Sequence, residues 1–140
     1  MIHLEPALLS DLMAFLEKRH GAEVPEIYRR AAGIHWAGGP VWKAMAGDIT
    51  VCVGGIVHSQ IDEAWIWTCS ESPRAIVGIV RLLRRIVTEQ RAAIGRPIVA
   101  RVDPENFNGI WLAMLCGLGW NGDLLEGGAV MTTEADEWQS

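Results

Sequence analysis

The sequence predicts an α/β (α+β) domain in which a mixed, mostly antiparallel sheet is flanked by helices. The chain has 140 residues, half of them apolar, which is enough to bury a core without disulfide bonds or metal. Its hydrophobic pattern changes from a helical to an alternating period near residue 41 and back near residue 73. No internal repeat or linker divides it. We therefore expect one domain over residues 1–133 and an acidic tail over residues 134–140.

The N-terminal part predicts a strand and two helices. Residues 2–5 alternate between apolar and polar side chains, as a short strand does. Ser10-Asp11 offers an N-cap for a helix that Gly21 would end. A second short helix is expected over residues 25–32, where a proline suits the first turn. The glycines that follow predict an irregular segment over residues 33–40.

The middle of the chain predicts an antiparallel meander. β-branched and aromatic residues form three runs, Val41 to Ala46, Ile49 to His58 and Ala64 to Cys69, with short polar turns between them. Gly54-Gly55 lies inside the second run. We interpret this pair as a bulge or a close approach of two backbones, in preference to a phosphate loop.

The clearest predicted element is a long amphipathic helix from Pro73 to about Ile94. Its apolar side chains occupy one broad arc, and the opposite arc carries arginines. These are Arg74, Arg81, Arg84, Arg85 and Arg91. A solvated helix face is the usual explanation of such a stripe, and an acidic partner or a nucleotide phosphate is the alternative.

The C-terminal part predicts a strand, a helix and a hairpin. Pro97 to Val102 is an apolar run typical of an interior strand. A loop with several capping candidates, residues 103–108, precedes an apolar helix that Gly117 or Gly119 would close. Two short runs after this helix, residues 120–125 and 129–133, predict the final hairpin.

This order of elements resembles that of the GNAT N-acetyltransferases. The best local match runs from Asn108 to Trp120, after a strand that ends in Arg101-Val102-Asp103. It resembles the family's segment in which an Asn caps a helix that ends in Gly-Phe. The resemblance covers almost the whole chain in the order of its elements, and it is specific in residues over about positions 98–120. It implies a GNAT-like fold.

The resemblance also implies a cofactor, acetyl-CoA. In the family a strand splays from its neighbour, the cofactor inserts there, and backbone N–H groups at the start of the long helix hold its pyrophosphate. Here that place would be Cys69 to Gly78. The cofactor-binding positions that the resemblance implies are Thr68, Ser72, Arg74, Gly78 and Asn108.

Two features depart from the family's pattern. Pro73 removes a backbone donor and Glu71 adds a negative charge where the pyrophosphate would lie, and both changes weaken an anion site. Leu115 stands where many members have a Tyr that protonates the departing thiolate. Because a hydrocarbon side chain cannot donate a proton, another group or water would have to do so.

In the family that the chain resembles, either a carboxylate on a strand or an ordered water can take the proton of the amine, so a general base need not be prominent. Glu63, just before the third strand of the meander, is the first candidate, and His58 on the preceding strand is the second. The alternatives are an ordinary turn carboxylate and an ordinary edge-strand histidine. No other catalytic motif and no metal-ligand spacing is present in the sequence.

The chain contains seven tryptophans, which is many for its length. Trp36 and Trp42 lie where the family places its substrate-facing loop, so they are candidates to line a pocket or a partner interface. Four others are expected to pack in the core because tryptophan supplies a large buried area. These are Trp65, Trp67, Trp111 and Trp120.

Two functions from different classes follow from the resemblance. The first is transfer of an acetyl group from acetyl-CoA to a primary amine. The second is protein binding without catalysis, as in short phage-encoded proteins that keep the GNAT outline. A double glycine within a strand, a Trp-rich strand and the absent Tyr are similar to that group, whose setting would be a virion or the host cytoplasm.

The charge and composition of the chain limit the classes of partner that we expect. The net charge of −5 and the absence of a basic tail give no reason to expect nucleic acid or an anionic membrane. The N-terminus lacks an export signal pattern, so we expect a cytoplasmic protein. A homodimer through the sheet edge or the final hairpin is an open alternative to a monomer.

Overall fold

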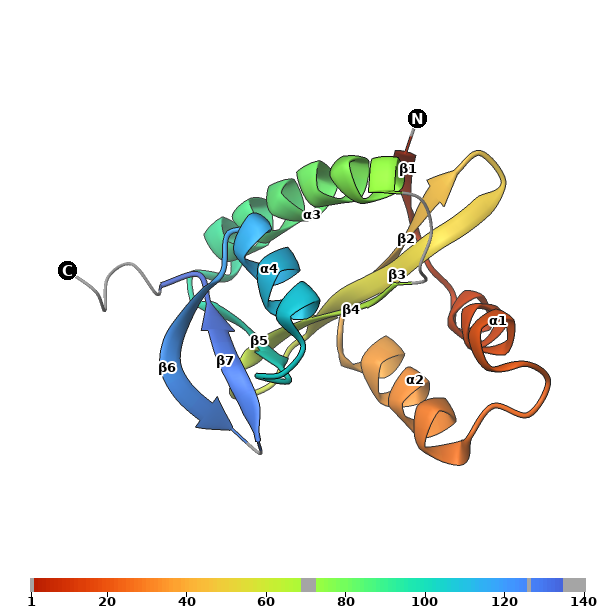
Figure 1. Ribbon diagram of the computed structural model, residues 1–140, viewed down its shortest axis with the longest axis horizontal. Helices are drawn as coiled ribbons and strands as arrows, with labels where there is room; N and C mark the ends of the chain where they lie inside the picture. Colours follow the sequence, from red (N-terminus) through yellow and green to blue (C-terminus); the bar gives the residue numbers. More distant parts are fainter. Residues whose placement is uncertain (1, 69–72, 126, 135–140) are drawn as a thin grey trace. The chain divides into compact units, whose positions relative to one another are not determined.

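The computed structural model describes residues 2–68, 73–125 and 127–134 (Figure 1). Its helices and strands are β1 (Ile2–Pro6), α1 (Leu9–His20), α2 (Glu26–Gly38), β2 (Val41–Ala46), β3 (Ile49–Val57), β4 (Asp62–Thr68), α3 (Pro73–Ile94), β5 (Ile98–Val102), α4 (Phe107–Leu115), β6 (Gly119–Leu125) and β7 (Gly128–Thr132). The order is the one predicted. None of the described helices has both the length and the apolar character needed to cross a membrane.

Contacts between residues divide the chain into two compact units. The first consists of Met1–Ser59 and Trp65–Ile79, and the second of Gln60–Ala64 and Val80–Ser140. The division falls inside β4 and inside α3, so each of these elements contributes residues to both units.

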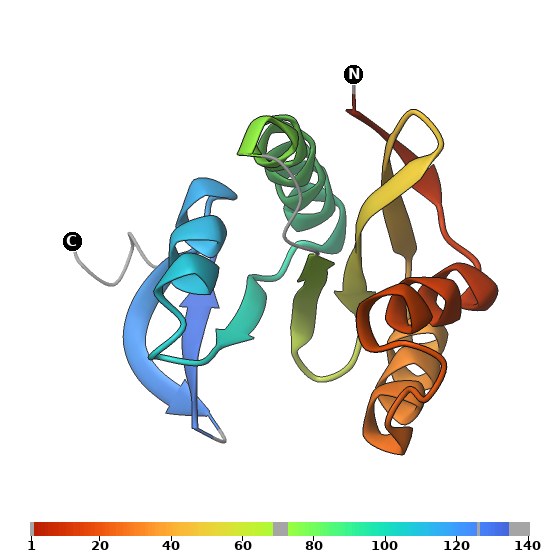
Figure 2. The ribbon, with the colours of Figure 1, turned by 45° about the vertical axis from the view of Figure 1, so that its right-hand side comes forward.

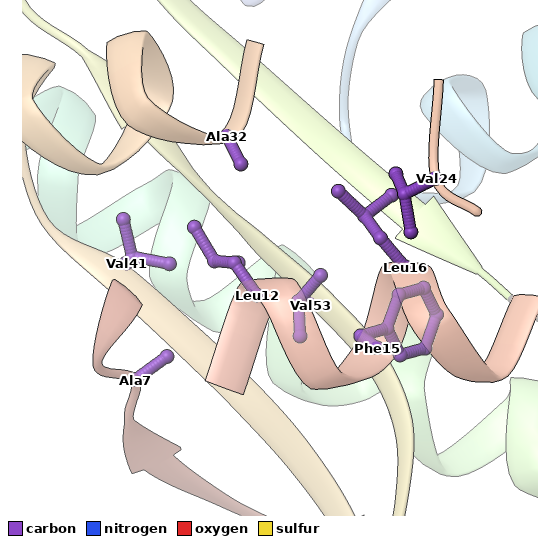
Figure 3. Close-up of a cluster of buried hydrophobic side chains, with 8 residues drawn as sticks. All are labelled: Ala7, Leu12, Phe15, Leu16, Val24, Ala32, Val41 and Val53. Carbon is purple, nitrogen blue, oxygen red and sulfur yellow. The ribbon is translucent and has the colours of Figure 1, made fainter. Parts of the chain in front are cut away.

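The first unit is an antiparallel sheet with α1 and α2 packed against it. Its strand order is β1-β2-β3-β4, and the described ladders from β1 to β3 are antiparallel, with a register shift at Ala44/Met45. α1 and α2 lie side by side (Figures 1 and 2). Figure 3 shows the buried cluster that joins α1 to the sheet, in which Leu12, Phe15 and Leu16 of α1 meet Val53 of β3.

The second unit combines one parallel and two antiparallel strand pairs. The start of β4 pairs with β5 in parallel, and β7 pairs antiparallel with β5 on one side and with β6 on the other. Its buried cluster contains Cys116, Leu118 and Met131, against which side chains of α3, β5 and α4 pack. The predicted class, a mixed and mostly antiparallel sheet flanked by helices, is confirmed.

The structure bears out one interpretation of the glycines. A Cβ atom on Gly54 would lie 2.8 Å from the Trp65 carbonyl oxygen, and one on Gly55 would lie 2.4 Å from the Pro40 carbonyl oxygen. Both glycines are buried in β3. They therefore serve a close approach of backbones, whereas the register shift between β2 and β3 lies at Val51, where Ala44 pairs with Cys52 and Met45 pairs with Thr50.

Several predicted boundaries are wrong. α1 begins at Leu9 after an N-cap at Leu8, so Asp11 is the third residue of the helix and not its cap. α2 continues to Gly38, because Gly33 is tolerated inside it, and the predicted irregular segment 33–40 is mostly helical. α4 is capped by Asn106, whose side chain accepts a hydrogen bond from the Gly109 N–H at 3.0 Å.

Candidate functional site

The strand pair β4 and β5 begins with an ion pair between a buried and an exposed side chain. The parallel ladder between these strands sets Asp62 opposite Ile98 and Glu63 opposite Val99. Asp62 is almost fully buried, and its Oδ2 lies 2.9 Å from Nη2 of the more exposed Arg96. This ion pair compensates part of the cost of burying a carboxylate and fixes the residue that precedes Glu63.

Glu63 makes a two-point ion pair with Arg101 on the neighbouring strand. Arg101 Nε lies 2.8 Å from Oε2 of Glu63, and Arg101 Nη2 donates to Oε1 at 3.0 Å. Such a fork holds the carboxylate in one orientation. Glu63 is thus a carboxylate whose position is set by the neighbouring strand. Sequence reasoning missed Arg101, because its pairing with Glu63 depends on the parallel register.

His58 lies just after β3 in the first unit, whereas Glu63 belongs to the second. The backbone N–H of His58 donates to the Gly38 carbonyl at 2.9 Å. A Cβ atom on Gly39 would lie 3.0 Å from Cδ2 of the His58 ring, so the ring rests against the end of α2. The side chain is exposed, and the glycines before β2 make room for it.

Three aromatic rings from α2 and β4 pack together in the first unit. The His35 ring lies 4.5 Å from the Trp65 ring at an interplanar angle of 18°, and 5.5 Å from the Trp67 ring. The Trp65 and Trp67 rings lie 5.0 Å apart. Both tryptophans pack against the core cluster of this unit, as predicted. The sequence did not predict that His35 joins them, since the second helix was expected to end at Ala32.

The other tryptophans in the described part of the chain divide between the two units and differ in exposure. Trp36 on α2 is exposed and Trp42 on β2 is half-buried. Trp111 on α4 and Trp120 on β6 are exposed, so the prediction that they pack in the core is wrong. Apart from Asn108, the side chains of α4 are apolar, and only one side of the helix can face the sheet.

The predicted cofactor positions are described only in part. Ser72 lies outside the described residues, as do the side chains of Thr68 and Arg74, although Thr68 ends β4 and Arg74 lies in the first turn of α3. A Cβ atom on Gly78 would lie 3.0 Å from Cγ1 of Ile2, so this glycine lets α3 approach β1. Asn108 is exposed in the first turn of α4, and the capping role expected of it belongs to Asn106.

The cysteines in the described part of the chain are Cys52 and Cys116, and both thiols are buried. Burial raises the pKa of the Cys116 thiol to about 11, so little of it is thiolate near neutral pH. Within the described residues, no group of three or more His, Cys, Asp or Glu side chains could hold a metal ion.

Comparison with solved structures gives one consistent answer. The chain is similar to an acetyltransferase of the GNAT family from Streptococcus pneumoniae, with a TM-score of 0.65 and 16% identity over 94% of this chain and 98% of the other. It is similar to a Bacillus subtilis acetyltransferase in complex with CoA, with a TM-score of 0.67 and 12% identity over 94% and 95%. It is also similar to the ribosomal-protein-S18-alanine N-acetyltransferase from Escherichia coli, with a TM-score of 0.68 and 15% identity over 94% and 92%.

The sequence comparisons give no match: neither a family model nor a curated protein is similar enough. At identities of 12 to 16% the structural likeness concerns the fold. The GNAT fold that the order of elements predicted is thereby confirmed.

Proposed function

We propose that this chain, which has the GNAT fold, transfers an acetyl group from acetyl-CoA to an amine. The observation that carries the proposal is the likeness to acetyltransferases along nearly the whole length of both chains. One of those neighbours was solved in complex with CoA, and another acts on an alanine of a ribosomal protein. The acceptor class proposed here is therefore a primary amine.

The described residues fit a cofactor site in part. α3 begins at Pro73, the position expected to start the helix that holds a pyrophosphate, and its free N–H groups suit an anion. The described ladder between β4 and β5 covers two residue pairs at the start of each strand. In the proposal, backbone groups of Thr68 and the start of α3, with Ser72, Arg74 and Gly78, hold the cofactor.

The chemistry proposed for the chain's own residues is proton transfer and orientation. Bound acetyl-CoA would supply a thioester carbonyl carbon that a neutral amine can attack. Glu63 would take the proton that the attacking nitrogen loses, directly or through one water, and Arg101 would orient the carboxylate. His58 is the second candidate base. Because Leu115 cannot protonate the departing thiolate, water would do so.

Ligand binding tests the cofactor part of this proposal. Saturating acetyl-CoA at about 100 times its dissociation constant adds roughly 2.7 kcal/mol, which for a chain of this size raises the unfolding midpoint by about 5 to 10 °C. Differential scanning fluorimetry measures the shift, and adenosine serves as the control ligand. No shift at millimolar acetyl-CoA would contradict the proposal and favour the noncatalytic, protein-binding alternative, for which Leu115 is the supporting feature.

Two variants test the role of Glu63. Glu63→Gln should lower kcat by roughly 100-fold or more, as expected when a general base is lost, while the acetyl-CoA shift is retained. Arg101→Gln breaks the same ion pair but keeps the carboxylate, so its kcat should fall much less. Equal loss of activity in both variants would assign the pair a structural role, and unchanged activity in Glu63→Gln would move the test to His58→Ala.

A further inference from the structure

The outer side of α3 carries four arginines within the second unit. Arg81, Arg84 and Arg85 are exposed, and Arg91 is half-buried near the end of the helix. At 100° per residue these positions share one arc, opposite the arc whose side chains pack on the core of the unit. We call these four side chains the arginine face. It is a cationic strip on a chain whose net charge is −5.

The arginine face has one counter-charge on α3 itself. This is Glu89, whose Oε1 lies 3.0 Å from Nε of Arg85. Among the residues that the structure describes, no carboxylate forms an ion pair with Arg81 or Arg84. Arg81 lies three and four residues before Arg84 and Arg85, a spacing at which like charges on a helix repel one another. A carboxylate brought to this part of the face would therefore stabilise it.

One end of the arginine face holds a carboxylate from the C-terminal part of the chain. Glu134 Oε1 pairs with Nε of Arg91, and the Glu134 side chain is mostly buried in this contact. The preceding residue is held to β5, because the Thr133 N–H donates to the Ile98 carbonyl at 3.1 Å and the Ile98 N–H donates to Thr133 Oγ1 at 3.1 Å. These contacts fix the point beside the last turns of α3 from which the chain continues.

The sequence that continues from Glu134 carries the opposite charge to the arginine face. Residues 135–140 lie outside the described residues, and they read Ala-Asp-Glu-Trp-Gln-Ser. Asp136 and Glu137 are acidic, and no basic residue accompanies them. The arginine stripe and the acidic segment are the two charged features of the sequence that the acetyltransferase proposal does not use. Their charges are complementary.

The distances allow the two features to meet. Arg84 lies seven residues before Arg91, which is about 10 Å along the helix axis. Two or three extended residues beyond Glu134 span about 7 to 10 Å. Because Glu134 already lies at Arg91, a segment that runs back along α3 brings the backbone of Asp136 and Glu137 beside Arg84.

We propose that residues 135–140 dock along the arginine face, with Asp136 and Glu137 against Arg84 and Arg81. Arg81 is about one helical turn beyond Arg84, within the added length of a Glu and an Arg side chain. A single exposed ion pair contributes little to stability. A tethered segment, however, has an effective concentration in about the millimolar range, so it pairs without the entropy loss of capturing a separate molecule. The docked segment closes the arginine face to other anionic partners.

Zero-length crosslinking with a water-soluble carbodiimide tests the contact. The reagent joins an amine to a carboxylate only where the two touch, and Arg84→Lys supplies the amine while it keeps the charge of the arginine face. At low micromolar concentration the monomer should contain a crosslink from position 84 to Asp136 or Glu137, identified by mass spectrometry after proteolysis. Its yield should fall several-fold in 1 M salt, where the Debye length is about 3 Å.

Arg30→Lys on α2 is the matched control for the crosslink. Arg30 is an exposed helix arginine of the first unit, and the substitution keeps charge and helix propensity just as Arg84→Lys does. The control should give no crosslink to Asp136 or Glu137. Absence of this crosslink in Arg84→Lys, or an equal yield in Arg30→Lys, would overturn the proposal.

Retention on a heparin column tests whether the segment closes the arginine face to a separate polyanion. Asp136→Asn/Glu137→Gln should elute at a higher salt concentration than wild type, because the arginines then meet the heparin. Glu17→Gln/Glu23→Gln removes two charges from exposed positions of the first unit, so it has the same net charge but should shift elution much less. Adding Arg84→Gln to the first variant should reverse most of its shift.

Equal elution of the two double variants would mean that the segment does not cover the arginines, and would reject the docking. The outcome is separable from the acetyltransferase proposal. None of the substituted residues is assigned to the base or to cofactor binding, and neither readout requires acetyl-CoA. The crosslink can therefore be absent while the acetyl-CoA thermal shift is observed, and the reverse result would reject the cofactor site alone.

Discussion

Asp11 shows how one side chain joins a helix terminus to the sheet. Its Oδ2 accepts the Leu8 N–H at 2.8 Å, and its Oδ1 accepts a hydrogen bond from Lys43 Nζ on β2 at 3.1 Å. The hydrogen bond from Leu8 lowers the pKa of Asp11 below 3.8, and Lys43 adds to this effect while partial burial opposes it. The carboxylate therefore satisfies one free donor of α1 and anchors the helix to β2.

We expect Asp11→Asn to lower the free energy of unfolding by about 1 kcal/mol at pH 7, because the helix start loses its charged acceptor. Urea denaturation measures the change. Glu26→Gln is the matched control, since Glu26 lies in the first turn of α2 but its ion pair with Arg30 is exposed. That pair should contribute at most a few tenths of a kcal/mol.

The pH dependence gives the sign of the effect. Because the pKa of Asp11 is lower in the folded than in the unfolded chain, its stabilisation is fully present above 3.8 and is lost as the pH falls through the folded value. The stability difference between wild type and Asp11→Asn should therefore shrink below pH 3.8. A difference that stays constant down to pH 2 would contradict the role of the charge.

Residues whose roles depend on register are the ones that sequence could not predict. Ser10-Asp11 could be recognised in the sequence as the start signal of a helix, although the N-cap is Leu8, two residues before Ser10. The Glu63–Arg101 ion pair could not, because the two residues are 38 apart and become neighbours only through the parallel register of β4 and β5. The stacking of the His35 ring on the Trp65 ring could not be predicted either, because it depends on how far α2 continues along the chain.

At the scale of elements, replacing glycine by alanine should have opposite effects on the free energy of unfolding at two positions. Gly55 in β3 has backbone 2.4 Å from where a Cβ atom would lie, and Gly33 in α2 has no atom within 4 Å of that position. Gly55→Ala should lower the free energy of unfolding by about 1 to 3 kcal/mol or more, because β3 and the start of β2 would have to separate.

Gly33→Ala should raise the free energy of unfolding by roughly 0.5 to 1 kcal/mol, because alanine favours a helix interior over glycine. Urea titrations of both variants under the same conditions provide the comparison. If both variants lost similar stability, the close approach at Gly55 would not be the cause. If Gly33→Ala were destabilised, the continuation of α2 to Gly38 would be wrong.

The kind of element was easier to predict than its exposed side. The period of α3 predicted both its extent and its apolar arc, and Gly95 follows its end with a φ of +74°. α4 was predicted as a helix, yet its side chains are apolar apart from Asn108, so its sequence gives no arc to assign to the core. The exposure of Trp111 therefore required the tertiary structure.

At the scale of the whole molecule, the order of elements predicted the fold although no sequence relative is similar enough to show it. The order of elements can be predicted without a relative, because each helix or strand is recognised from its hydrophobic period and from the signals at its two ends. The division of contacts into two units was not predicted, since it falls inside β4 and α3, where neither composition nor period changes.

The division into two units bears on how cooperatively the chain unfolds. Each unit has its own buried cluster, with Leu16 in the first and Met131 in the second. β4 and α3 belong to both units, so unfolding either one removes residues from an element that the other needs. Leu16→Ala and Met131→Ala should each cost about 2 to 5 kcal/mol and lower the midpoint of one shared transition.

Circular dichroism and tryptophan fluorescence, recorded on the same urea titration, distinguish one transition from two. Fluorescence reports mainly on the first unit, because Trp65 and Trp67 pack on its core while Trp111 and Trp120 of the second unit are already exposed, whereas circular dichroism reports on the helices of both units. If continuity through β4 and α3 couples the units, both probes should give the same midpoint in wild type and in both variants. A Met131→Ala titration with two separated steps would mean that the first unit holds its fold alone, and that the shared elements can fray at the point of division without unfolding it.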